Sequence, residues 1–125
     1  MARRTPAQLF CLLGGGLLLA RGLVGFAFLD SSFDTPGEGW HHLIHLVSGV
    51  ALLAALAGGE AVSRLAALAF GAGYTTLALA GIIDGNDAFG LIAADFADKA
   101  FHVVIGLASL GAGLASGGGR PVVTA

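Results

Sequence analysis

Four long apolar segments dominate this sequence, and the charged side chains lie almost entirely between them. A helix of roughly 20 apolar residues crosses the hydrocarbon core of a bilayer, and no segment alternates with the period of two that a barrel strand needs. Hydrophobic residues make up 56% of the chain and charged residues 11%, a balance too apolar for a soluble protein of this size. The sequence therefore predicts an all-α membrane protein, one domain over residues 1–125 that sits in the lipid bilayer as a four-transmembrane-helix bundle. The predicted spans cover residues 9–29, 41–58, 65–83 and 100–116.

The first apolar segment has one rival interpretation, a cleaved signal peptide, because it follows a short basic lead. However, the apolar run resumes after Arg21 and offers no cleavage site between small residues. We therefore expect the segment to be retained as a helix.

The distribution of charge predicts the orientation of the bundle. Seven of the eight acidic residues lie in the segments 30–39 and 84–99. The two termini and the connection between the second and third spans carry Arg3, Arg4, Arg64 and Arg120. Basic residues favour the cytoplasmic side. We therefore expect both termini in the cytoplasm, and the acidic loops and histidines at the outer face. The net charge of -2, with no basic patch, argues against nucleic acid as a partner.

Histidines open the second and the fourth apolar segments. His41, His45 and Gly49 are spaced four apart, so on a helix they share one face. Asp98, His102 and Gly106 repeat this spacing. His42 lies off the face of its neighbours, and we expect it to point elsewhere and to matter least.

The two histidine segments also match each other at a constant offset of 57 residues. Both run from outside to inside, so the match predicts a parallel two-helix repeat with a pseudo-twofold axis along the membrane normal. Such an axis would place His45 and His102 at equal depth, facing the bundle interior within about 10 Å of each other. The matching pairs are His45/His102, Val47/Val104, Gly49/Gly106, Ala51/Ala108, Leu53/Leu110 and Ala55/Ala112.

These two motifs resemble those of the DUF4383 family of small four-helix bacterial membrane proteins. The first reads His-His-Leu-Ile-His-Leu-Val-Ser-Gly over residues 41–49, with His42 where the family tends to have asparagine. The second opens with Asp98 and reaches His102, with Lys99 in place of the usual asparagine. The resemblance implies a four-helix fold in the bacterial cytoplasmic (inner) membrane, and it implies no settled function.

Three interpretations of the histidines remain open. The first is structural: His45 and His102 hydrogen-bond across helices, with Asp98 fixing the tautomer of one ring. The second is a divalent metal site formed by His41, His45, Asp98 and His102. The third is a haem b held between His45 and His102. A His/Asp relay for protons or a solute is a weaker alternative.

Other polar residues should support this layer. Arg21 lies inside the first span, where an unpaired cation is costly, so it should face the bundle and pair with Asp98 or Asp95. Tyr74 adds a polar group near the middle of the third span.

The sequence carries no recognisable enzyme motif, neither a phosphate-binding loop nor a nucleophile with a base in reach. We therefore expect a non-catalytic protein with a structural or accessory role, and as the alternative a membrane subunit that binds haem b or a metal through His45 and His102. The expected partner is the lipid bilayer, and the sequence leaves a larger membrane complex or a homo-oligomer open.

Overall fold

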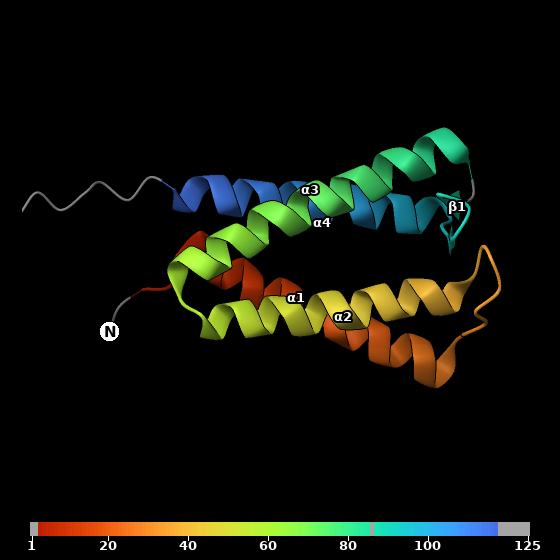
Figure 1. Ribbon diagram of the computed structural model, residues 1–125, viewed down its shortest axis with the longest axis horizontal. Helices are drawn as coiled ribbons and strands as arrows, with labels where there is room; N and C mark the ends of the chain where they lie inside the picture. Colours follow the sequence, from red (N-terminus) through yellow and green to blue (C-terminus); the bar gives the residue numbers. More distant parts are fainter. Residues whose placement is uncertain (1–2, 86, 118–125) are drawn as a thin grey trace, which may run out of the picture.

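Four helices form the part of the chain that the computed structural model describes, residues 3–85 and 87–117. All four are long and apolar enough to cross a membrane, which confirms the predicted all-α class and the four apolar spans. In chain order they are α1 (Pro6–Phe28), α2 (Glu38–Ala57), α3 (Glu60–Asp84) and α4 (Phe96–Ser116) (Figure 1).

Each helix begins three to five residues before its predicted span, because its first turn includes polar residues. Thr5 caps α1, where its hydroxyl accepts from the backbone N–H of Gln8. Asp95 caps α4 in the same way, and the Asp98 side chain accepts in return from the Asp95 N–H at 3.0 Å. Such capping boxes satisfy backbone donors that a helix start leaves unpaired. Two acidic residues that the sequence analysis assigned to loops, Glu38 and Asp98, therefore lie in the first turns of α2 and α4.

The helices pack as two close antiparallel pairs, α1 with α2 and α3 with α4 (Figure 1). Glycines allow the backbones to approach. A Cβ placed on Gly49 of α2 would lie only 2.8 Å from the carbonyl oxygen of Gly15 in α1. A Cβ on Gly106 of α4 would lie 2.9 Å from the backbone nitrogen of Thr75 in α3. Close backbone contact through small residues is the usual way for membrane helices to pack.

Large apolar side chains cover the outside of the bundle rather than its interior. Leu13, Val47 and Leu65 are each more than half exposed, and Phe28 and Ile83 about 80%. Such a surface suits contact with lipid tails. The apolar part of the interior is a small cluster that includes Cys11, Leu18, Leu52, Tyr74 and Ile105.

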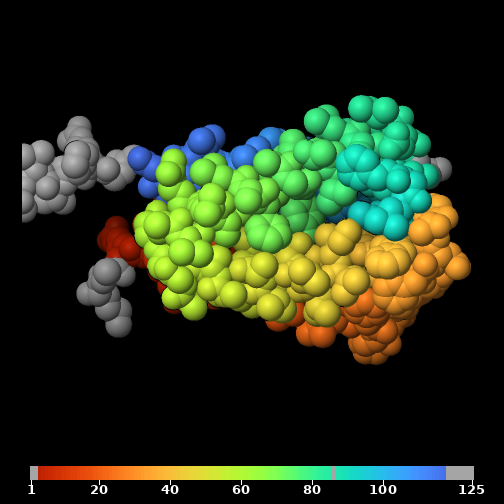
Figure 2. Space-filling view, in the orientation of Figure 1, coloured from red at the N-terminus to blue at the C-terminus, as the bar shows by residue number. Residues whose placement is uncertain are grey.

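The two acidic loops meet at one end of the bundle. The second loop, predicted as irregular, contains a short antiparallel hairpin of β1 (Asp87–Ala88) and β2 (Ile92–Ala93). The backbone N–H of Gly37, in the first loop, donates to the Leu91 carbonyl at 3.0 Å. Figure 2 shows the hairpin in cyan against the first loop in orange. This contact joins the two loops at the end of the bundle where the histidines lie.

Candidate functional site: a buried histidine cluster

Three imidazole rings meet inside the bundle, and we call His41, His45 and His102 the histidine cluster. These residues come from α2 and α4 and are at most 2% exposed. One ring nitrogen of each lies within 4.8 Å of the others. The rings of His45 and His102 have centroids 6.0 Å apart, which matches the inward positions expected from the sequence.

Within the cluster, the closest contact joins His41 and His102. Their Nε2 atoms are 3.1 Å apart, so one ring donates and the other accepts. Nε2 of His45 is buried and has no hydrogen-bond partner among the described residues. The cluster therefore contains one satisfied pair and one free nitrogen.

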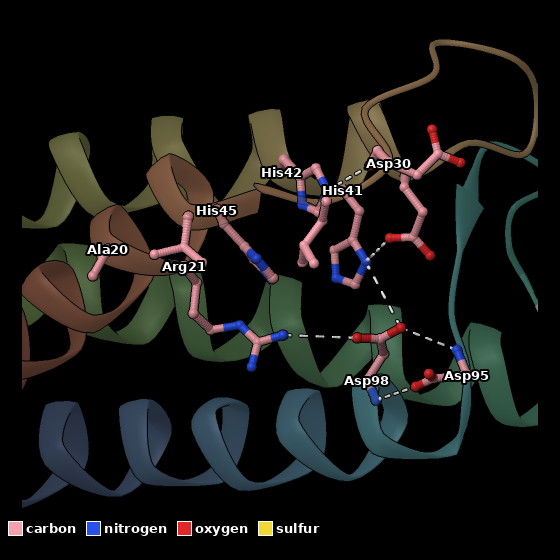
Figure 3. A pocket seen from close by; sticks show the side chains of 11 residues that line it. Ala20, Arg21, Asp30, His41, His42, His45, Asp95 and Asp98 are labelled. Atoms are coloured by element: carbon pink, nitrogen blue, oxygen red, sulfur yellow. Dashed lines mark hydrogen bonds and ion pairs between the residues drawn. The ribbon is translucent and has the colours of Figure 1, made fainter. Parts of the chain in front are cut away.

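Carboxylates lie on the other side of His41 (Figure 3). Its Nδ1 is 3.6 Å from Glu38 Oε2 and 3.9 Å from Asp98 Oδ2. The second oxygen of Asp98 is 3.8 Å from Nη2 of Arg21, whose guanidinium also lies 4.4 Å from the ring centroid of Phe101. Asp98 thus stands between the cation of α1 and the histidine cluster.

Asp95 does not pair with Arg21, although the sequence analysis named both Asp95 and Asp98 as candidate partners; it caps α4 instead. It is exposed and accepts from the backbone N–H of Asp98 at 2.9 Å. This hydrogen bond lowers the pKa of the Asp95 carboxyl, because it stabilises the charged form. Asp95 therefore starts α4, whereas Asp98 faces the site.

Tyr74 and Phe101 enclose the cluster. The Tyr74 hydroxyl donates to Ser48 Oγ at 2.9 Å and so links α3 to α2, while its ring lies 5.6 Å from that of His102. The Phe101 ring meets that of His45 edge-on, with centroids 5.8 Å apart. The sequence analysis did not name Phe101 as part of the site. Its place directly before His102 in the chain was the one signal that could have suggested it.

His42 points away from the cluster, as expected, but its surroundings change the expectation that it matters least. Its Nε2–H donates to the Asp30 carbonyl at 2.8 Å, and the side chain is buried. The ring lies directly on Gly25 of α1, where no Cβ would fit. His42 therefore holds α2 against α1, and we now expect its replacement to destabilise that pair.

A cavity of about 580 Å³ opens beside the cluster, between α1, α2 and α4 (Figure 3). Three of its eleven lining residues are apolar, and of the eight polar ones four are acidic and three are histidines. Carboxylates and imidazoles in one lining are groups that can bind a cation. The lining residues are Ala20, Arg21, Val24, Leu29, Asp30, Glu38, His41, His42, His45, Asp95 and Asp98.

Comparison with known proteins gives one match. The family model described as "Domain of unknown function (DUF4383)" matches residues 33–115, which include α2, α3 and both histidine motifs. This finding confirms the resemblance drawn from those motifs. No curated protein and no solved structure matches the chain.

Proposed function

The chain belongs to the DUF4383 family, and we propose that it is a small multi-pass membrane protein with a structural or accessory, non-catalytic role. In this proposal the histidine cluster fastens the α1–α2 pair to the α3–α4 pair. The observation that carries it is the 3.1 Å contact between His41 of α2 and His102 of α4. If the helices separated inside a bilayer, these ring nitrogens would face lipid, which offers no hydrogen-bond partner. The contact therefore favours the assembled bundle. A larger membrane complex or a homo-oligomer remains the proposed setting for this role.

The glycine contacts support the proposed parallel repeat. Gly49 packs against Leu19 in the first pair, and Gly106 packs against Thr75 in the second. The two glycines are 57 residues apart and their partners 56, so the same contact recurs at nearly the same spacing.

A second pair of contacts follows the same rule. A Cβ on Gly15 would meet Leu53 at 3.1 Å, and one on Gly71 would meet Leu110 at 2.6 Å. Leu53 and Leu110 are themselves partners at the offset of 57. We therefore propose that the two pairs are copies of one unit, related by a pseudo-twofold axis along the membrane normal.

We further propose that both termini face the cytoplasm of a bacterial inner membrane, because the basic residues gather at that end. A reporter that is active only in the cytoplasm should then work when fused to either terminus. The same reporter should fail when inserted at Gly37 or Gly85, in the two acidic loops. Activity at Gly37 would reverse the orientation.

Replacing His102 by leucine tests the fastening role. The change leaves Nε2 of His41 without its partner, and we expect a loss of about 1 kcal/mol in the free energy of unfolding. Denaturant titration of the purified protein in detergent measures this loss. The control is Val104→Ala, a change at a side chain that is 68% exposed on the same helix. Equal stability of the His102 variant and the wild type would remove the fastening role.

A haem b between His45 and His102 is the second candidate, and the packing does not fit it. A macrocycle needs a slot between its two axial ligands that extends past both rings. Here Nε2 of His102 is already hydrogen-bonded to His41, and the Phe101 ring packs edge-on against the His45 ring. These contacts fill the space that a macrocycle would need. A single ion needs no such slot.

A further inference from the structure

We propose that the histidine cluster binds one divalent transition-metal ion of the Zn²⁺ type through ring nitrogens of His41, His45 and His102. This inference rests on the proposed function, because it uses the same meeting of α2 and α4. It adds a ligand to a cluster that otherwise only holds helices together.

The spacing of the ring nitrogens is the first support. Two nitrogens bound to one tetrahedral zinc ion at 2.0–2.1 Å lie about 3.3 Å apart. The Nε2 atoms of His41 and His102 are 3.1 Å apart, and one ring nitrogen of each of the three histidines lies within 4.8 Å of the others. Small rotations of the rings would therefore bring three nitrogens around one ion. Three histidines are a familiar ligand set for zinc, with a fourth position left for another ligand.

The unpaired nitrogen of His45 is the second support, and it is independent of the spacing. The His45 side chain is 1% exposed, and its Nε2 has no hydrogen-bond partner among the described residues. A buried polar atom without a partner costs free energy, so each case calls for an explanation. An ion at the cluster would bond to this nitrogen and would replace the proton that His41 and His102 share.

The carboxylates beside His41 are the third support. A histidine that binds a metal usually presents its other ring nitrogen to a carboxylate, which fixes the tautomer and makes the ligand more basic. Nδ1 of His41 faces Glu38 Oε2 at 3.6 Å and Asp98 Oδ2 at 3.9 Å, while Nε2 faces the cluster. The ring is thus oriented as a metal ligand would be.

The cavity gives an ion a way in and helps to define its class. Four acidic residues line it together with His41 and His45, and the only cation among its lining residues, Arg21, already faces Asp98. This balance attracts cations to the cluster. Imidazole nitrogens favour zinc, copper, nickel and cobalt, whereas Mg²⁺ and Ca²⁺ prefer oxygen ligands. The site should therefore select the first group.

The experiment uses the full chain purified in detergent with a tag that contains no histidine. After treatment with EDTA and its removal, the protein is titrated with Zn²⁺ and with Co²⁺, and bound metal per chain is determined by elemental analysis. We expect one ion per chain, a visible Co²⁺ spectrum typical of tetrahedral nitrogen ligands, and a higher unfolding temperature with Zn²⁺ but not with Mg²⁺. Glu38→Gln should weaken zinc binding about tenfold, because it removes a carboxylate behind His41.

His45→Leu is the sharpest variant, because it removes a ligand and leaves the His41–His102 contact in place. It should abolish binding, whereas Val104→Ala, at an exposed side chain outside the cluster and the cavity, should still bind one ion. The metal site would be overturned if folded wild-type protein bound no more Zn²⁺ than His45→Leu. If the wild type binds no Zn²⁺ at all, the result holds whether or not the variant folds. The fastening role is judged separately, from the metal-free stability of His102→Leu, so the two proposals fail by different measurements.

Discussion

Replacing Gly49 by valine should prevent α1 and α2 from packing and leave the protein unfolded or aggregated in detergent. The new side chain would meet the backbone of α1, because even a Cβ lies 2.8 Å from the Gly15 carbonyl oxygen and from Leu19 Cα. Backbone atoms in a helix cannot move aside as a flexible side chain does, so the helices must separate along their contact. Overpacking in cores typically costs 1–3 kcal/mol, and here we expect about 3 kcal/mol or more. Size-exclusion chromatography and helical circular dichroism on heating measure the effect.

The chain offers a matched control for this change. Gly111 lies on α4, and a Cβ placed on it would meet nothing within 4 Å, so Gly111→Val should behave as the wild type. Gly106→Val should be as harmful as Gly49→Val, because it meets Thr75 of α3 in the equivalent place. A normally folded Gly49→Val protein would contradict the close packing of the pairs and weaken the repeat.

Asp98→Ala should have the second largest effect, a loss of about 2 kcal/mol in the free energy of unfolding. The change leaves Arg21 without its carboxylate inside the membrane span and removes one acceptor from the start of α4. Breaking a buried pair can cost 3–5 kcal/mol, but the N–O distance of this pair is long, 3.8 Å, and both residues line the open cavity, so we expect a smaller loss. Denaturant titration in detergent provides the measurement.

Two further variants separate the causes of this loss. Asp98→Asn keeps a side-chain acceptor for the helix start and removes only the charge, so it should lose less than alanine. Combining Asp98→Asn with Arg21→Leu should restore part of the stability, because no unpaired charge then remains. If the double variant lost the sum of both single effects, the Arg21–Asp98 pair would have no energetic role.

Much of the fold was predictable because a bilayer leaves few choices. Apolar segments of this length must satisfy their backbone hydrogen bonds internally, and helices do so. The helix starts were less predictable, because Glu38 and Asp98 are acidic and yet lie within the helices. The hairpin at Asp87–Ala88 and Ile92–Ala93 was missed because strands of two residues leave no periodic pattern.

The candidate site was predictable in its residues but not in its contacts. Spacing placed His41 and His45 on one face of α2, and the repeat paired His45 with His102. In the structure the ring nitrogen of His102 contacts that of His41, while the His45 ring lies 6.0 Å from the His102 ring, because side-chain packing and not the sequence offset decides which rings bond. His42 was undervalued because its partners, the Asp30 carbonyl and Gly25, lie in a loop and in another helix.

The central claim is that an imidazole of α2 meets an imidazole of α4 inside the bundle. The direct measurement is an NMR experiment on the metal-free protein with ¹⁵N-labelled histidine, which detects coupling between ring nitrogens across an N–H···N hydrogen bond. We expect one such coupling, between Nε2 of His41 and Nε2 of His102, and its loss in His102→Leu. Independent signals for all four rings, with exchange of every ring proton with water, would show that the two helix pairs are not joined in this way.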